Sequence, residues 1–255
     1  MNLDPKAPIG VFDSGLGGIS VLKRLMEQMP EEDYVFFGDR KNAPYGVKSA
    51  KEVLNLTEGA YELFREQGCK AMVIACNTAT GVAADALRSR HPDFPILAIE
   101  PAVKPAAEAF PGGKILLMAT PLAIKTERIR SLARRFQKRA SIQLLPCPGL
   151  VELIETGHLS DEVLKEKLKS LFEGLEKPDA VVLGCTHFPH VAPAIGEYFG
   201  SSVRLFDGGE GVARHTETVL MKNRLKKESG EKGWVRFIFS KGDEKTYALA
   251  NQLLF

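Results

Sequence analysis

The chain alternates short apolar runs with segments whose apolar residues recur at helical spacing. In the first hundred residues, the apolar runs lie at 9–12, 34–37, 71–75 and 95–99. Runs of four or five residues that are rich in β-branched side chains are typical of buried parallel strands. Because helical segments separate the runs, the sequence predicts an α/β fold with mostly parallel sheets.

The same pattern restarts near residue 114. Apolar runs at 114–119, 141–145 and 181–183 follow one another as the first three runs do, again with helical segments between them. Repetition of a strand–helix unit over about a hundred residues indicates duplication. We therefore predict two pseudo-symmetric α/β domains.

The tail of the chain carries an alternating apolar segment at 234–239, typical of an edge strand, and a final helical pattern at 244–254. A tail of this size can return to complete the first half. We expect a discontinuous first domain of residues 1–95 plus 206–255, and a second domain of residues 96–205.

A cysteine follows the third apolar run in each half. Cys76 and an Asn-Thr pair follow the run at 71–75, and Cys185 and a Thr-His pair follow the run at 181–183. Open α/β sheets bind ligands at the carboxyl ends of their strands. We therefore expect an active site in the cleft between the domains, with one thiol from each. Two opposed thiols suit removal of a proton from one face of a carbon and its return to the other face.

Other uses of the cysteines fit less well. Cys185 and His187 supply too few ligands for a zinc site, and nucleophilic Cys–His catalysis needs one cysteine and leaves Cys76 unexplained. Cys69 and Cys147 are interpreted as small buried hydrophobic residues. Four cysteines without CxxC spacing give little support to a disulfide framework, so we expect a reducing cytoplasm.

A glycine-rich turn at 13–18 (DSGLGG) joins the first apolar run to a helical pattern. Backbone N–H groups at a helix N-terminus form an anion site. Asp13 could cap the helix or bind an ammonium group. The spacing is neither that of a Rossmann turn nor that of a Walker A motif, so nucleotide binding is not expected.

The balance of charges excludes several classes of protein. With 34 Lys and Arg against 32 Asp and Glu, the net charge of +2 argues against a nucleic-acid-binding protein. The basic stretch at 125–139 is interpreted as the solvated face of an amphipathic helix. No run reaches the roughly 18 apolar residues of a membrane helix, and the polar residues 1–8 lack a signal-peptide core.

Segments 12–18, 44–46, 75–79 and 184–189, together with Asp39, resemble the cofactor-independent aspartate/glutamate racemase family, in particular the glutamate racemases. The resemblance runs in order from about residue 9 to residue 207. It implies an isomerase that racemises L- and D-glutamate by a two-base mechanism, without cofactor or metal. It also implies a homodimer that supplies D-glutamate for peptidoglycan, and so for cell wall biogenesis and cell shape.

The resemblance also assigns roles to residues. It implies that Cys76 takes the α-proton from D-glutamate and Cys185 from L-glutamate, while the opposite thiol returns a proton. Asp13 would orient the substrate ammonium and assist Cys76, whereas His187 and Glu155 would assist Cys185. The two substrate carboxylates would be held by short hydroxyls, amides and backbone N–H groups, from Ser14, Tyr45, Gly46, Asn77, Thr78, Thr120 and Thr186.

Two residues depart from the family pattern. Asn42 stands where the family often has Arg, and Glu152 replaces a frequent proline, so Glu152 competes with Glu155 as the acidic helper, although the alignment favours Glu155. Two alternatives stay open: a racemase of aspartate or another amino acid on the same fold, and a non-catalytic amino-acid-binding or regulatory protein.

Overall fold

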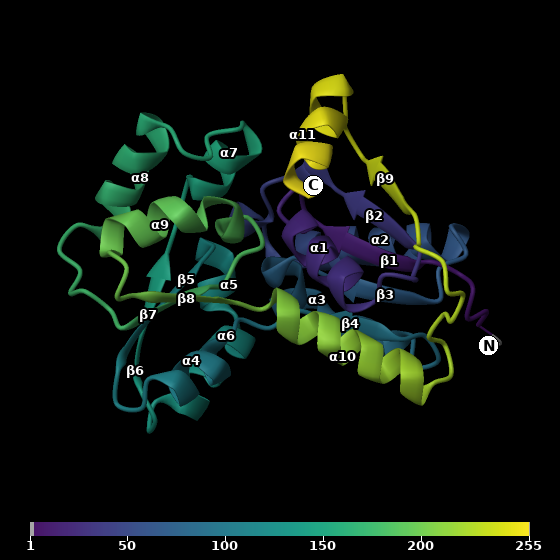
Figure 1. Cartoon of the computed structure of the whole chain (residues 1–255), viewed down its shortest axis with the longest axis horizontal. Helices are drawn as coiled ribbons and strands as arrows, with labels where there is room; N and C mark the ends of the chain where they lie inside the picture. Colours follow the sequence, from purple (N-terminus) through teal and green to yellow (C-terminus); the bar gives the residue numbers. More distant parts are fainter. Residues whose placement is uncertain (1–2, 255) are drawn as a thin grey trace.

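Two separate sheets form the framework of the chain, and the computed structural model that describes residues 3–254 places them side by side (Figure 1). Residues 1–2 and 255, the outermost residues of the first predicted domain, lie outside this range. The strands of the first sheet are β1 (Ile9–Asp13), β2 (Tyr34–Gly38), β3 (Ala71–Ile74), β4 (Ile96–Ala98) and β9 (Val235–Phe239), and those of the second are β5 (Lys114–Ala119), β6 (Ser141–Pro146), β7 (Ala180–Leu183) and β8 (Arg204–Asp207).

The two sheets repeat one topology. The first has the order β4-β3-β1-β2-β9 and the second the order β6-β5-β7-β8. If β5 to β8 are equated with β1 to β4, the four shared strands lie in the same order, and the pairs are parallel in both sheets. The predicted α/β fold with parallel sheets is therefore confirmed, and β9 adds the predicted edge strand beside β2.

The chain changes sheets a few residues away from the predicted boundaries. Residues 96–98 form β4, which pairs with β3 in the first sheet, whereas residues 204–207 form β8, which pairs with β7 in the second. The crossings therefore follow Ala98 and Asp207. A short apolar run predicts a strand but not the sheet that it joins, because pairing depends on residues distant in sequence.

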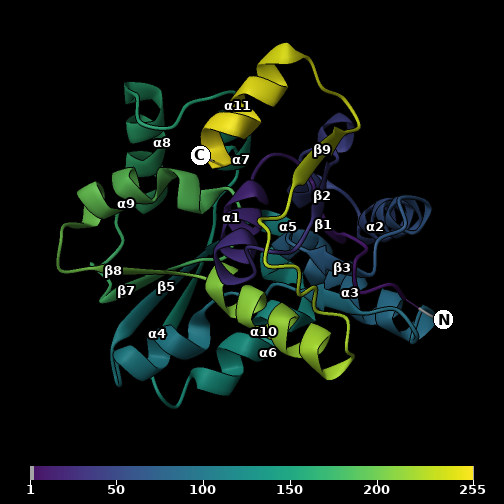
Figure 2. The same ribbon diagram turned by 45° about the vertical axis from the view of Figure 1, so that its right-hand side comes forward.

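Helices cover both faces of each sheet (Figure 2). In the first unit, α1, α10 and α11 pack on one face and α2 and α3 on the other; in the second unit, α4 and α6 pack on one face and α7, α8 and α9 on the other. The helices are α1 (Ile19–Gln28), α2 (Ala50–Glu66), α3 (Asn77–Arg90), α4 (Val103–Ala109), α5 (Pro121–Lys125), α6 (Glu127–Phe136), α7 (Leu150–Glu155), α8 (Glu162–Phe172), α9 (Ala192–Phe199), α10 (Gly209–Lys222) and α11 (Glu244–Leu254), with short 3₁₀ turns η1 (Arg40–Asn42), η2 (Tyr45–Val47) and η3 (Phe188–Val191).

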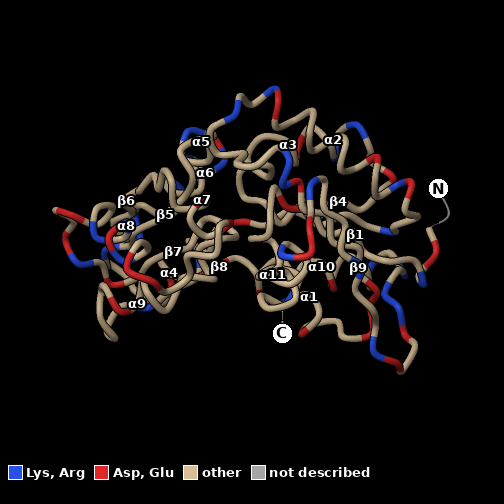
Figure 3. The backbone as a smooth tube through the Cα atoms, turned by 90° about the horizontal axis from the view of Figure 1, so that it is seen from above, with Lys and Arg blue, Asp and Glu red and all other residues tan. Residues whose placement is uncertain are grey.

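The basic stretch at 125–139 is divided between α5 and α6. Thr126 separates them, because its hydroxyl accepts a hydrogen bond from the backbone N of Ile129 and caps α6. Lys and Arg positions alternate with Asp and Glu positions along the backbone of both units (Figure 3). None of the helices in the described part of the chain is both long and apolar enough to cross a membrane.

The centre of the first sheet is packed closely enough to require a glycine. All five residues of β1 are buried, and the ring of Phe64 from α2 lies over Gly10. A Cβ at Gly10 would lie 2.5 Å from Cγ of Phe64, which is closer than side-chain carbons approach one another. Helix α2 can therefore pack this close to strand β1 only because residue 10 has no side chain.

The substitution Gly10→Ala should lower the free energy of unfolding by about 1–3 kcal/mol, because the buried Phe64 ring must move. The matched control is Gly59→Ala within α2, where an added Cβ meets no atom within 4 Å. The control should raise the free energy of unfolding by about 0.5–1 kcal/mol through helix propensity. Urea denaturation of both variants measures the two changes. Equal effects would contradict the close packing.

Candidate active site

Cys76 lies between the end of β3 and the start of α3. The helix begins at Asn77, and Cys76 is its N-cap residue. The Cys76 sulfur accepts a hydrogen bond from the backbone N of Ala79 at 3.5 Å and lies 3.4 Å from the Ser14 hydroxyl oxygen. The thiol, 4% exposed, is thus held at the carboxyl edge of the first sheet.

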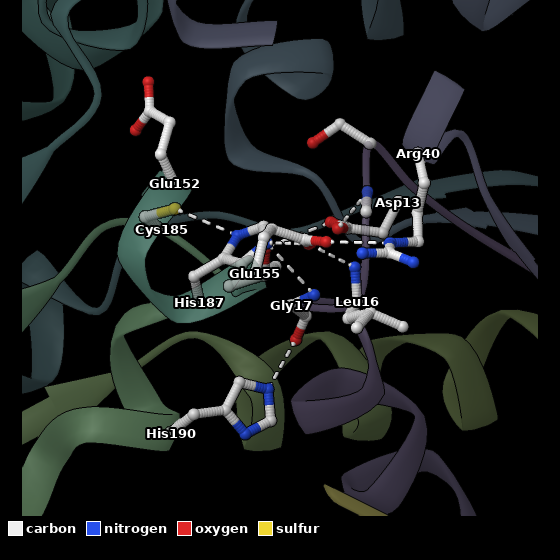
Figure 4. A network of polar contacts seen from close by, with 12 residues as sticks. Asp13, Leu16, Gly17, Arg40, Glu152, Glu155, Cys185, His187 and His190 are labelled. Carbon is white, nitrogen blue, oxygen red and sulfur yellow. Dashed lines mark hydrogen bonds and ion pairs between the residues drawn. The ribbon is translucent and has the colours of Figure 1, made fainter. Parts of the chain in front are cut away.

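Cys185 occupies the equivalent edge of the second sheet, just after β7. Its sulfur lies 3.7 Å from Nδ1 of His187 (Figure 4), and its side chain is also buried. The pKa of Cys76 is raised to about 12 by burial, by the negative charge of Asp13 and, to a lesser extent, by the Cys185 thiolate. The pKa of Cys76 therefore responds to the charge of Cys185, which lies on the other unit.

Asp13 is fully buried where β1 ends. Its Oδ1 accepts a hydrogen bond from the Thr186 hydroxyl at 3.0 Å, and its Oδ2 accepts one from the backbone N of Gly15 at 3.0 Å. The N-cap of α1 is Gly18, which makes no side-chain cap, so Asp13 does not cap that helix. Burial raises the pKa of Asp13. A buried carboxylate from the first unit is thus held by a hydroxyl from the second.

Glu155, at the end of α7, is the acidic partner of His187. Its Oε1 lies 2.6 Å from Nε2 of His187 and also accepts a hydrogen bond from the backbone N of Leu16 at 2.6 Å (Figure 4). Among the described residues, the Glu152 carboxylate takes part in no hydrogen bond or ion pair, and in Figure 4 it points away from the histidine. The geometry therefore distinguishes the two glutamates.

The pair is ionised at neutral pH. Burial alone would raise the pKa of Glu155, but hydrogen bonds from His187, Leu16 and Arg40 and the charge of His187 lower it to about 2. Burial likewise disfavours the imidazolium, yet the contacts with Cys185 and Glu155 raise the pKa of His187 well above its usual range. An imidazolium beside the Cys185 sulfur stabilises negative charge there.

The glycine-rich turn binds groups of the second unit. The expected anion site exists in part, because Glu155 itself supplies an anion to the backbone N of Leu16. A Cβ at Gly15 would lie 2.1 Å from Oε1 of Glu155, and a Cβ at Gly17 would lie 2.4 Å from Nδ1 of His187. These glycines are therefore needed so that the carboxylate and the imidazole can approach the backbone.

Three of the residues expected to hold carboxylates lie against one another. The hydroxyls of Thr78 and Thr120 lie 2.8 Å apart, and Thr120 lies against Gly46, whose added Cβ would be 2.8 Å from the threonine Cβ. The side-chain oxygen Oδ1 of Asn77 is buried and has no hydrogen-bond partner in the described structure. The hydroxyls of Thr78 in the first unit and Thr120 in the second therefore meet where the two units face each other.

Asp39 organises the loop that carries Tyr45. The buried carboxylate accepts a hydrogen bond from the Tyr45 hydroxyl at 2.7 Å, and the Asn42 amide donates to both of its oxygens at 3.0 Å. Burial and the Asp39 carboxylate raise the pKa of Tyr45, which stays neutral. The Asn42 departure therefore places an amide, rather than a guanidinium, on Asp39.

Two contacts of the site were missed from the sequence. Arg40 donates from Nε to Oε2 of Glu155 at 3.0 Å, and His190 lies with Nε2 3.2 Å from the carbonyl oxygen of Gly17. Burial and the positive charge of His187 lower the pKa of His190 to about 4, so it is neutral. Two features of the sequence could have indicated these residues. Arg40 follows Asp39 just after a strand, and His190 lies three positions after His187.

The remaining thiols and the potential metal ligands lie elsewhere. Cys69 packs in the core beneath α2 and α3, and Cys147 in the core beneath α7 and α8. Within residues 3–254, Glu58, Glu62 and His91 place possible ligand atoms within 4.8 Å of one another. His91 follows the C-terminal end of α3, whereas Cys76 precedes its N-terminal end, a distance of about 20 Å.

Comparisons with known proteins agree with this geometry. The model of the Asp/Glu/Hydantoin racemase family matches residues 9–216. A glutamate racemase of Clostridium acetobutylicum is 44% identical over 249 residues, covering 97% of this chain and 97% of the relative. Glutamate racemase from Francisella tularensis, solved in complex with D-glutamate, superimposes with a TM-score of 0.83 at 26% identity, covering 98% of this chain and 94% of that one. Escherichia coli glutamate racemase, solved in complex with L-glutamate and the activator UDP-MurNAc-ala, has a TM-score of 0.83 at 30% identity, covering 96% of this chain and 94% of that one.

The protonation state of His187 tests the choice between the two glutamates. In the unaltered protein, His187 should stay protonated at neutral pH and lose its proton only as the pH rises through its raised pKa. Glu155→Gln removes the anion, so the pKa of His187 should fall and the imidazolium should be lost at lower pH. The control Glu152→Gln should leave the titration unchanged. Nitrogen-15 NMR titration, assigned with His187→Asn, measures the shift; a shift with Glu152→Gln instead would reverse the assignment.

Proposed function

Because the chain belongs to the Asp/Glu/Hydantoin racemase family, we propose that it is an isomerase that interconverts L- and D-glutamate, with Cys76 and Cys185 as its two bases and without a cofactor. The observation that carries this function is the presence of two buried thiols at equivalent positions of two equivalent sheets. Each has its own ionisable neighbour, Asp13 for Cys76 and His187 for Cys185.

In the direction from L- to D-glutamate, the Cys185 thiolate removes the α-proton. The His187 imidazolium, held by Glu155, stabilises the negative charge on that sulfur before the transfer. Cys76, whose pKa is about 12, carries its proton and delivers it to the opposite face of the α-carbon. One proton enters Cys185 and one leaves Cys76, so the proton count balances.

The reverse direction starts from the Cys76 thiolate and the protonated Cys185. Asp13, whose pKa is raised by burial, is the group placed to accept a proton near Cys76 and to attract the substrate ammonium. The Thr186 hydroxyl, from the second unit, donates a hydrogen bond to Asp13 and so helps to hold the carboxylate that assists Cys76. The two directions therefore use different helpers on the two sides of one carbon.

We assign the substrate carboxylates to polar groups near the carboxyl ends of the strands. These groups belong to Ser14, Tyr45, Gly46, Asn77, Thr78, Thr120 and Thr186. Glutamate is favoured over aspartate because the relatives solved with a substrate hold glutamate. One methylene is worth only about 1–3 kcal/mol in a pocket, so a comparison of rates for the two amino acids decides the substrate.

We further propose that the protein forms a homodimer in the cytoplasm and supplies D-glutamate for peptidoglycan. The four cysteines are free thiols, which is the form that a reducing compartment maintains. Sedimentation at several concentrations measures the oligomeric state. Depletion of the protein in its host should make growth depend on added D-glutamate.

The mechanism predicts that Cys76→Ala and Cys185→Ala each abolish racemisation, because one face of the carbon loses its base. Purified protein is incubated with L- or D-glutamate in heavy water, and the α-deuterium and the enantiomer are measured. The unaltered protein should yield the opposite enantiomer with solvent deuterium at Cα.

Cys69→Ala, which removes a buried thiol in the core beneath α2 and α3, is the matched control and should keep racemisation. Racemisation that persists in Cys185→Ala would contradict the two-base mechanism. Binding of glutamate without any exchange of the α-hydrogen in the unaltered protein would favour the non-catalytic alternative.

A further inference from the structure

Arg40 joins three segments that are distant in the sequence. It lies in η1, just after β2 in the first unit, and its Nε donates to Oε2 of Glu155 in the second unit at 3.0 Å. Its Nη1 donates to the hydroxyl of Thr246 in α11. Helices α7 and α11 lie next to each other in Figures 1 and 2, and Arg40 connects them.

The far end of this contact is itself fixed. The Thr246 hydroxyl donates to Oδ1 of Asp243 at 2.7 Å, and the Thr246 backbone N donates to the same oxygen at 2.9 Å. The backbone N of Lys41 also donates to the Ser240 hydroxyl at 3.0 Å. The loop that carries Arg40 is therefore held by hydrogen bonds to the C-terminal segment, through Ser240 after β9 and Thr246 in α11.

We propose that Arg40 is a positioning residue for the Cys185 half of the reaction: it holds the Glu155 carboxylate against His187, and thereby His187 against Cys185. Oε1 of Glu155 is shared by His187 and the backbone N of Leu16, whereas Oε2 accepts from Arg40. Without Arg40, this largely buried oxygen would lack its partner and the carboxylate could rotate away from the imidazole.

The effect should be confined to one side of the site. Asp13, beside Cys76, is held by the Thr186 hydroxyl and the backbone N of Gly15, and no cation of residues 3–254 forms an ion pair with it. Arg40 therefore has no corresponding contact on the Cys76 side. Its loss should slow proton transfer by Cys185 more than proton transfer by Cys76.

This inference rests on the proposed function, and hydrogen exchange is the measurement that reveals it. The enantiomers of glutamate have equal free energies, so kcat/KM is equal in both directions for any variant. In Arg40→Gln, Cys76 still forms the carbanion from D-glutamate, but proton transfer from Cys185 to that carbanion is slower. The carbanion therefore returns to D-glutamate more often, and the returned substrate carries deuterium whenever the Cys76 thiol has exchanged the substrate's hydrogen for solvent deuterium before the return.

The experiment compares Arg40→Gln with the unaltered protein in heavy water. We expect kcat/KM to fall by about 10- to 100-fold, the scale on which misplacement of a catalytic group acts. The ratio of deuterium in remaining substrate to deuterium in product should rise several-fold from D-glutamate and should not rise from L-glutamate. Thr246→Val, which keeps the Arg40–Glu155 pair, should change this ratio in the same direction by a smaller factor.

Arg128→Gln is the matched control, because it removes ion pairs of an arginine that lies away from the catalytic residues. Arg128, on α6, pairs with Asp85 on α3 at 3.3 Å and with Glu100 at 2.5 Å, and its side chain is 24% exposed, against 25% for Arg40. It contacts neither Glu155 nor His187. Its loss should leave the ratios of both enantiomers unchanged.

Three results would overturn the role of Arg40: an equal rise from both enantiomers, the same asymmetry in Arg128→Gln, or no change in Arg40→Gln and Thr246→Val. The two-base function is tested separately: it fails if Cys185→Ala still racemises glutamate, or if the unaltered protein binds glutamate without exchange of its α-hydrogen. An inactive Cys185→Ala together with a symmetric Arg40→Gln would refute the positioning role and leave the proposed function standing.

Discussion

The site depends on hydrogen bonds that cross from one unit to the other. Asp13 of the first unit is held by the Thr186 hydroxyl of the second, and Glu155 of the second is held by the backbone N of Leu16 of the first. Buried carboxylates are costly unless each is paired or hydrogen-bonded. Because each unit supplies partners for the other's carboxylate, the arrangement forms only when the two units are closed on one another.

The backbone is symmetric but the electrostatics are not. Strands β3 and β7 occupy equivalent places in their sheets and deliver Cys76 and Cys185 to equivalent edges. The carboxylate of Asp13 raises the pKa of Cys76, whereas the imidazolium of His187 lies beside Cys185. Duplication of the strand order thus provides two thiols, and divergence of their neighbours gives the two thiols different electrostatic surroundings.

The glycine-rich turn illustrates how a local motif depends on a distant partner. Its Asp-Ser-Gly-Leu-Gly-Gly pattern indicates an anion site, and the structure places the chain's own Glu155 carboxylate on it. The glycines at 15 and 17 leave room for Glu155 and His187, from segments more than a hundred residues away. Glu155, which orients the histidine, therefore also binds the first unit through the backbone N of Leu16.

The sequence by itself determined the α/β class, the duplicated strand pattern and the placement of the two cysteines at strand ends, because hydrophobic periodicity reports local burial. It also indicated Asp13, His187 and Glu155 through a family resemblance. Only the tertiary structure decided that Glu155 rather than Glu152 contacts His187, that Arg40 and His190 join the site, and that β4 and β8 belong to opposite sheets. The partners of a buried polar group come from segments that packing brings together, and a local pattern carries no record of that packing.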